Sequence, residues 1–228
     1  MSVRLLTNPT DLQIKQLVKV FHEANKRGKP RVSWFSVTSN NSKVFFLFAL
    51  KDEALVEPFL EALVKNTFAG GQVYVVETSD EGIVGAGLWF GPGQTSLRSE
   101  EQRQAGWNQL MERLDDSTRK WFIDVALESS LHNIPDLYYG QGGQEAAYHL
   151  QLFAVLPTCQ KKGYGKALMR HVEDKAKSEG ADVVLQAIGD RNVPMYKAFG
   201  YELVGVGPFV MPEGMGDPWP INCFRKRF

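Results

Sequence analysis

The sequence predicts an α/β protein with a mixed β-sheet and one large helical insertion. Three observations carry this prediction. In the last third of the chain, short apolar runs typical of strands alternate with helical patterns, which favours a sheet with at least one parallel pair. Two β-rich runs between Gln72 and Gly93 carry a hairpin signal. A long and mostly polar helical stretch separates that hairpin from the last third.

The composition is that of a soluble globular protein with a substantial core. The 228 residues are 43% hydrophobic and 23% charged, and 26 basic residues balance 26 acidic ones. No global field therefore attracts nucleic acid or an anionic membrane, and we expect neither as a partner. Any site for an anion must be local.

The sequence gives no sign of a secretory signal, a membrane span or a metal site. The longest aliphatic and aromatic run, Val44–Leu50, is too short to cross a bilayer. The two cysteines, Cys159 and Cys223, form no metal-ligand or redox spacing. We therefore expect reduced thiols, no bound metal and a cytoplasmic location.

The first part of the chain predicts a helix, a strand and a second helix. Apolar residues recur at helical spacing from Asp11 to Phe21. Val44–Leu50 reads as the first strand. The helix that follows should end at Gly70. Pro58 should either lie close to the first turn of this helix or kink it.

The middle of the chain predicts a hairpin and then the insertion. The runs "QVYVVETSD" and "GIVGAGLWFGPG" should pair across Ser79–Gly82. From Gln94 to about Gly143 the pattern is helical and polar, which we interpret as an insertion between strands and not as a separate domain. Residues 1–228 are thus predicted to form a single domain with its core at about 144–205.

The last third predicts strand, helix and strand in the runs "YHLQLFAVLP", "GYGKALMRHVEDKAKSEG" and "ADVVLQAIG". A short helix, "VPMYKAFG", and the strands "YELVGVGPF" and "INCFRKRF" follow. The glycine loop "QKKGYGKAL" connects the first of these strands, "YHLQLFAVLP", to the helix that follows it. Glycines in that position usually mean that an anion approaches the backbone.

Two familiar phosphate loops do not fit this glycine loop. A P-loop needs a glycine where Gln160 stands and a hydroxyl where Ala167 stands. A dinucleotide fingerprint needs a third glycine where Leu168 stands.

The loop instead resembles the acyl-CoA signature of the GNAT N-acetyltransferase superfamily, V-x-P-x-x-[QR]-x-x-G-x-[GA], in Val155–Pro157 and Gln160–Gly165. A second block, Asn192–Tyr201, resembles the later N…Y-x-x-x-G-[FY] block of that family. The resemblance covers roughly Gly71 to Phe228. Judging by "RNVPMY" and "FAVLP", the chain is most similar to the puromycin-acetyltransferase-like members and uncharacterised fungal relatives.

The resemblance implies a GNAT acyl-CoA N-acyltransferase fold with acetyl-CoA as co-substrate. Main-chain N–H groups at the start of a helix would bind the pyrophosphate, and the pantetheine arm would lie along the strand before it. The residues implied in cofactor binding are Phe153, Ala154, Val155, Gln160, Lys161, Lys162, Gly163, Tyr164, Gly165, Lys166, Asn192 and Tyr196.

The implied reaction is direct attack of an amine on the thioester, with a tetrahedral oxyanion held by a backbone N–H near Val155. Tyr196 matches the general acid of the family, and a phenol pKa of about 10 suits a proton donor at neutral pH. The acceptor is expected to be a small-molecule primary amine, and the protein a monomer or homodimer.

The chain departs from the family at Gln186, where a glutamate often serves as base. Glutamine takes up no proton, and an alkyl amine of pKa about 10.4 is only ~0.04% neutral at pH 7. Either another group acts as base or the acceptor is a weakly basic amine, such as an arylamine. His149 is the candidate base, since strict alternation would place it on one strand face with Gln151, Phe153 and Val155. Glu77 and Glu145 are weaker candidates.

Structural roles stand beside these assignments. Tyr196 could be a packing tyrosine, His149 an ordinary strand histidine and Asn192 a helix N-cap. Lys161 and Lys162 could form a solvated face. The absent glutamate also leaves open a non-catalytic acyl-CoA-binding or regulatory module, and a protein-lysine acetyltransferase is a third alternative.

Overall fold

The computed structural model describes residues 2–26, 52–214 and 217–228. The strand predicted at Val44–Leu50 lies outside the described residues.

Seven strands form one mixed sheet in the order β1-β2-β3-β4-β5-β7-β6. The central pair β4–β5 is parallel, and every other neighbouring pair is antiparallel. This confirms the predicted α/β fold class with its parallel pair. The strands are β1 (Val3–Leu6), β2 (Gln72–Thr78), β3 (Gly82–Phe90), β4 (Tyr148–Val155), β5 (Val183–Ile188), β6 (Glu202–Phe209) and β7 (Trp219–Lys226).

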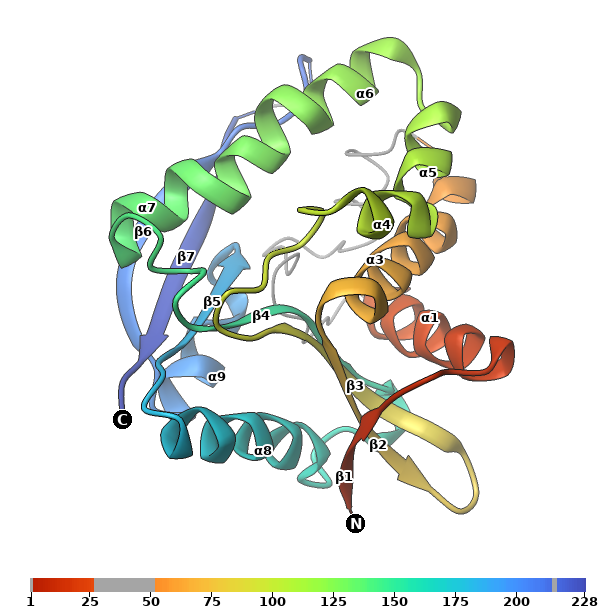
Figure 1. The fold of residues 1–228 in the computed structure, drawn as a ribbon, viewed down its shortest axis with the longest axis vertical. Helices are drawn as coiled ribbons and strands as arrows, with labels where there is room; N and C mark the ends of the chain where they lie inside the picture. The colour runs from red at the N-terminus through yellow and green to blue at the C-terminus, as the bar shows by residue number, and fades with distance from the viewer. Residues whose placement is uncertain (1, 27–51, 215–216) are drawn as a thin grey trace.

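The helices fall into three groups along the chain. Among the described residues, two α-helices precede β2, several short helices lie between β3 and β4, and two more flank β5 (Figure 1). The α-helices are α1 (Asp11–Lys26), α3 (Val56–Gly70), α4 (Glu100–Gln102), α5 (Asn108–Arg113), α6 (Asp116–Trp121), α7 (Ile134–Tyr139), α8 (Tyr164–Ser178) and α9 (Val193–Ala198). Single 3₁₀ turns occupy Glu53–Leu55, Pro157–Cys159 and Asp190–Asn192, and π-helical stretches occupy Arg103–Trp107, Phe122–Leu127 and Ser129–Asn133.

Local sequence features account for where α3 and the turn before it begin and end. The side chain of Asp52 accepts a hydrogen bond from the Ala54 N–H at 2.9 Å, which caps the turn that leads into α3. Pro58 lies in the first turn of α3, and the helix ends at Gly70, as predicted. Strand β1 was not predicted, because four residues with a single fully buried side chain give almost no periodic signal.

Among the inserted helices between β3 and β4, α4 and α5 lie beside α3, and α7 lies beside β6 (Figure 1). Ser99 and Gln102 start them with a reciprocal capping box. Two hydrogen bonds tie the insertion to β6 and the residue after it, from Tyr138 Oη to the Val206 carbonyl at 2.6 Å and from Trp121 Nε1 to the Val210 carbonyl at 3.0 Å. The predicted helical insertion is therefore present and anchored to the sheet.

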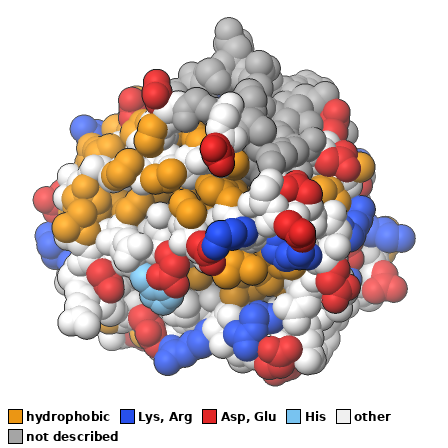
Figure 2. Space-filling model, turned by 90° about the horizontal axis from the view of Figure 1, so that it is seen from above, with side chains coloured by type: hydrophobic (Ala, Val, Ile, Leu, Met, Phe, Trp, Pro, Cys, Tyr) orange, Lys and Arg blue, Asp and Glu red, His pale blue; other side chains and the backbone are white. Residues whose placement is uncertain are grey.

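Hydrophobic side chains gather in a broad area of the surface when the molecule is seen from the side of the insertion (Figure 2). The large exposed apolar residues of the insertion and of β6 with its following residue are Ile123, Leu137, Val206 and Val210.

The two central strands pair over only part of their length. Their parallel register runs from Tyr148 opposite Val183 to Leu150 opposite Leu185 and ends there. On its other side, β4 carries a β-bulge, since Leu150 and Leu152 face the consecutive residues Trp89 and Leu88. Gln151 is the extra residue of this bulge. We call the point where β4 and β5 part, at Gln151 and Gln186, the split.

Candidate functional site

The loop between β4 and α8 turns sharply through left-handed backbone. Lys161 has φ +64° and Gly163 has φ +86°, and α8 begins at the next residue, Tyr164. Gly163 is the N-cap of α8 and brings no side chain to the cap position. The first N–H groups of an α-helix have no partner within the helix, so the start of α8 offers main-chain donors and a positive dipole end.

A cavity of 220 Å³ opens in front of this helix start. Phe153 and Val155 of β4 form one wall of the cavity. Met195 of α9 and Phe199, the residue directly after α9, form another. A Cβ at Gly165 would lie 3.0 Å from Cζ of Phe153, so a larger residue there would press on that ring. The full lining is Phe153, Val155, Cys159, Gln160, Lys161, Gly163, Tyr164, Gly165, Lys166, Met195 and Phe199. We call this the loop cavity.

Most of the residues expected to bind the cofactor meet at the loop cavity. Those that line it are Phe153, Val155, Gln160, Lys161, Gly163, Tyr164, Gly165 and Lys166. Ala154, Lys162, Asn192 and Tyr196 are not in its lining. Ala154 is fully buried between two residues that do line the cavity, as expected for the opposite face of a strand. Cys159, Met195 and Phe199 line the cavity and were not predicted, because their apolar types carry no motif signal.

Gln160 closes the end of β4. Its Nε2 donates a hydrogen bond to the Val155 carbonyl oxygen at 3.1 Å. The carbonyl oxygen of the last residue of β4 is thereby satisfied by a side chain. The glutamine of the sequence signature thus has a structural task in this chain.

Tyr196 and Asn192 lie behind the cavity wall. The Tyr196 side chain has no solvent-exposed area, and its ring packs against Tyr201 and Phe224 with centroids 6.0 and 5.2 Å away. Asn192 is buried at the N-cap position of α9, where its side chain makes no capping hydrogen bond.

His149, Gln151, Phe153 and Val155 do not all share one face of β4, and the expectation that they do was wrong. The bulge at Gln151 breaks the alternation of β4. Gln151 accepts a hydrogen bond from Thr67 of α3 at 3.4 Å, whereas Phe153 lies against Gly165 of α8. Burial lowers the pKa of His149 from its ordinary 6.5 to about 3. An imidazole with so low a pKa is a poor base at neutral pH.

The weaker base candidates are also engaged elsewhere. Glu77 accepts two hydrogen bonds from Arg4, at 2.7 and 2.8 Å, and these hold the pKa of its carboxyl below the usual value. It lies on β2, two strands away from the split. Glu145 forms an ion pair with Arg98.

A second cavity, of 530 Å³, lies under the insertion, and we call it the insertion cavity. Figure 1 shows α8 and the helices α6 and α7 on opposite sides of β4 and β5. The lining is Thr95, Ser96, Leu97, Arg98, Arg103, Trp107, Ile123, Leu127, Glu128, Leu131, His132, Asp136, Gly142, Gln144 and Glu145. None of these residues was identified as a binding residue from the sequence, apart from Glu145 as a possible base.

Two hydrogen bonds join the insertion cavity to the split. Gln151 of β4 donates from Nε2 to Ser96 Oγ at 2.9 Å, and Gln186 of β5 donates from Nε2 to Gln144 Oε1 at 3.1 Å. Ser96 and Gln144 both line the insertion cavity. The point where β4 and β5 part therefore has the glycine loop on one side and this polar cavity on the other.

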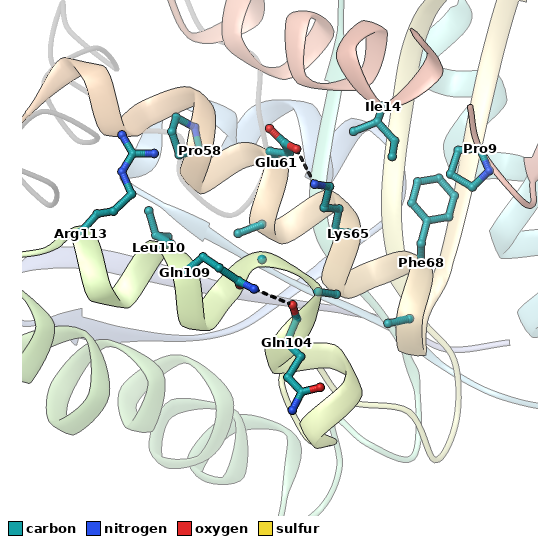
Figure 3. A pocket seen from close by; sticks show the side chains of 14 residues that line it. Pro9, Ile14, Pro58, Glu61, Lys65, Phe68, Gln104, Gln109, Leu110 and Arg113 are labelled. Atoms are coloured by element: carbon teal, nitrogen blue, oxygen red, sulfur yellow. Dashed lines mark hydrogen bonds and ion pairs between the residues drawn. The ribbon is translucent and has the colours of Figure 1, made fainter. Parts of the chain in front are cut away.

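A third and larger opening, of 670 Å³, lies between α3 and the start of the insertion (Figure 3). Glu61 and Lys65 form an ion pair of 2.6 Å across one turn of α3 in its wall. No described residue of β4, β5 or α8 lines this groove, so it is remote from the split.

Within the described residues, 2–26, 52–214 and 217–228, no group of three or more histidine, cysteine or acidic side chains is placed to hold a metal ion. The helices in these ranges include none that combines the length and the apolar character needed to cross a bilayer.

Residues 71–201 match the family model described as the acetyltransferase (GNAT) family, which is more than half of the chain. The match contains both motif blocks, the loop cavity and the split. No curated protein matches the sequence.

Solved structures with the same fold cover the whole chain at low identity. One is described as a histone acetyltransferase HPA2 and related acetyltransferase from Corynebacterium glutamicum, with 18% identity, a TM-score of 0.58 and 97% of its own length covered. A mosquito arylalkylamine N-acetyltransferase like 5b has 18% identity, a TM-score of 0.54 and full coverage of both chains. An aminoglycoside 6′-N-acetyltransferase complexed with coenzyme A has 10% identity, a TM-score of 0.51 and 97% of its length covered. At these identities the likeness shows the fold.

Proposed function

Because the chain belongs to the GNAT family of acetyltransferases, we propose that it moves an acetyl group from acetyl-CoA to the primary amine of a small molecule. The observation that carries this proposal is the split. Two parallel strands part at Gln151 and Gln186, with a glycine-lined cavity on one side and a polar cavity on the other.

The loop cavity suits the phosphate end of coenzyme A. The start of α8 supplies main-chain N–H groups and a positive dipole end, and Lys161 and Lys166 add cationic side chains at the rim. The pantetheine arm would then run between β4 and β5, where strand pairing has stopped and main-chain groups of β4 are available to its amides. Phe153 and Val155 would flank the arm.

The insertion cavity suits the acceptor. It is large enough for a small molecule, and its floor carries Ser96 and Gln144, which are bonded to the two residues of the split. An amine in this cavity faces a thioester that enters from the other side. The insertion, which we place at about 94–143, thus shapes the acceptor site.

The reaction is a direct transfer with no covalent enzyme intermediate. The amine nitrogen forms a bond to the thioester carbonyl carbon, the carbon–sulfur bond breaks, and the amine loses one proton while the departing thiolate gains one. A main-chain N–H of β4 near Val155 would stabilise the oxyanion, and Tyr196 would donate the proton to sulfur.

A second function, a non-catalytic acyl-CoA-binding module, has one observation in its favour. Gln186 is buried at the split and hydrogen-bonded to Gln144, so the position cannot supply a base. The module would bind acetyl-CoA in the loop cavity and transfer nothing.

The finer assignments remain predictions. They are the puromycin-acetyltransferase-like branch, which rests on "RNVPMY" and "FAVLP", a single domain over residues 1–228, a monomer or homodimer, and a cytoplasmic location.

The two functions separate in one pair of measurements. Calorimetry with acetyl-CoA should give a binding heat, and release of free coenzyme A thiol should require an added amine from a panel of aryl, α-amino and alkyl amines. Binding with no thiol release from any amine would favour the module. An absence of binding heat would refute both functions.

A further inference from the structure

The polar side chains at the split are buried and carry no charge. Gln151 and Gln186 are each 1% exposed, and their partners Ser96 and Gln144 are 3% and 7% exposed. Asn66 extends the group, since its Nδ2 donates to Ser96 Oγ at 2.7 Å. Amide and hydroxyl groups such as these bind hydrogen-bonding atoms and do not ionise at physiological pH. Of these residues, Ser96 and Gln144 line the insertion cavity, at the place where it meets the split.

Resting on the proposed function, we infer that the acceptor is a weakly basic amine, neutral near physiological pH, such as an arylamine or the α-amino group of an amino acid amide. Ser96 and Gln144 line the insertion cavity and are hydrogen-bonded to Gln151 and Gln186, so the uncharged part of the cavity that meets the split favours the neutral amine over an alkylammonium ion. Aliphatic diamines and lysine side chains are then poor substrates.

The physical reason is the cost of desolvating a cation. An ammonium group taken from water into a buried site needs a counter-charge, and amide oxygens supply only partial compensation. His149 of β4, in register opposite Val184 just before the split, shows how strongly this part of the protein disfavours a cation. Burial alone lowers the pKa of that imidazole from 6.5 to about 3.

Two other titratable groups near the split, those of Tyr139 and Cys223, also carry no charge. Tyr139 donates from Oη to the Leu185 carbonyl at 2.7 Å, and Cys223 is the register partner of Gln186 on β7. Burial raises the pKa of both groups, that of Cys223 to about 12, so both stay protonated and neutral.

Charged side chains also line the insertion cavity. Arg98 pairs with Glu145, and Asp136 accepts a hydrogen bond from the Gly142 N–H at 3.0 Å. Arg103 pairs with Glu100 at 2.9 Å, and Glu128 and His132 are exposed on the inserted helix. The stretches that the structure does not describe, residue 1, 27–51 and 215–216, contain by sequence no aspartate, glutamate, histidine, tyrosine or cysteine. Glu128, Asp136, Glu145 and His132 are therefore the groups to test as an alternative base.

The size of the selection follows from protonation. At pH 7 roughly a tenth of an α-amino group of pKa about 7.8 is neutral, against ~0.04% of an alkyl amine of pKa about 10.4. The α-amino compound should therefore be acetylated with a kcat/KM about 300-fold higher at pH 7.

The first test compares glycinamide with n-butylamine between pH 6 and 9.5. The kcat/KM for butylamine should rise tenfold per pH unit over the whole range, while that for glycinamide should level off near pH 8. A butylamine profile that levels off below pH 8 would reveal a base in the protein and overturn the inference. So would a loss of butylamine turnover in Glu128→Gln, Asp136→Asn, Glu145→Gln or His132→Gln that spares glycinamide.

The second test introduces a carboxylate at position 186, where related acetyltransferases often have a glutamate. Gln186→Glu should raise kcat/KM for butylamine at pH 7 by about tenfold relative to glycinamide, and Gln186→Asn, the matched neutral change, should not alter that ratio. Coenzyme A affinity, measured by calorimetry, shows that each variant keeps its fold. Equal ratios in both variants would overturn the inference.

The third test does not depend on turnover. Calorimetry of butylamine binding to the coenzyme A complex at pH 7, in buffers of different ionisation enthalpy, counts the protons released. One proton per bound amine supports entry as the neutral form, and none overturns the inference. If coenzyme A binds and one proton is released but no amine is acetylated, the charge selection stands and the proposed catalytic function fails.

Discussion

The two cavities that flank the split are built in different ways. The loop cavity takes its character from the backbone, namely two left-handed residues, a helix start and glycines that leave room. The insertion cavity takes its character from side chains that come from the 95–98 loop, the inserted helices and the 142–145 loop. If the loop cavity holds the cofactor and the insertion cavity the acceptor, as proposed, the first site is fixed by main-chain geometry, whereas the second depends on packing between distant segments.

The cavities also differ in charge. The loop cavity has Lys161 and Lys166 at its rim, which suits a phosphate. The residues of the insertion cavity that meet the split, Ser96 and Gln144, are uncharged and hydrogen-bonded. One side of the split thus carries cationic side chains at its rim, and the other meets the split with uncharged groups.

The largest expected effect comes from Tyr196, the proposed general acid. Tyr196→Phe removes the phenol oxygen and keeps the ring that packs on Tyr201 and Phe224. If this phenol donates the proton to the thiolate, kcat should fall by about 10²- to 10⁴-fold. Steady-state kinetics with glycinamide measure it.

Coenzyme A affinity is the control for that variant, and it should stay within about twofold, since Tyr196 is outside the lining of the loop cavity. A kcat within threefold of the unmodified protein would assign Tyr196 to packing alone.

The next largest effect is expected from a substitution that obstructs the loop cavity and does not touch the insertion cavity. Gly165→Val would bring methyl groups against Phe153 and into the mouth of the cavity, and should weaken acetyl-CoA binding by on the order of 100-fold. Isothermal calorimetry gives the Kd.

Gly180→Val is the matched control, because Gly180 lies at the other end of α8, where its φ of +66° strains any side chain although space is open. This control should lower the melting temperature and leave the Kd within about twofold. Equal losses of affinity would mean that the glycines act through helix stability and not through the ligand.

The difference between the cavities also explains what the sequence could predict. The loop residues Gln160, Gly163 and Gly165 are close in the chain and act through backbone geometry, so a local motif identified them. The parallel pair and the hairpin followed from periodicity and turn residues.

The insertion cavity had no such signal. Ser96 and Gln144 meet Gln151 and Gln186 only through tertiary packing, and single polar residues in loops carry no period. The bulge at Gln151 was equally hidden, because one extra residue in a fully buried strand changes no hydrophobic pattern. That one residue is what misplaced His149 in the sequence-based assignment.

The smallest of the three expected effects is a pH dependence of stability caused by His149, and it tests whether the interior beside the split disfavours a positive charge. The unfolded chain protonates His149 below about pH 6.5, while the folded protein does so only near pH 3. The unfolded state therefore binds more protons between these values, and the free energy of unfolding falls as the pH drops through this window. Between pH 7 and pH 5 this one residue should remove about 2 kcal/mol, which urea unfolding at each pH measures.

His149→Gln should reduce that pH dependence by the same amount, because the variant has no imidazole to protonate. His171→Gln, which removes an exposed histidine on the α8 side, should leave the dependence as in the unmodified protein. If both variants behave alike, the interior beside the split tolerates a cation as readily as the surface does. The exclusion of alkylammonium acceptors would then lose its physical basis, while the glycine loop and its anion would be unaffected.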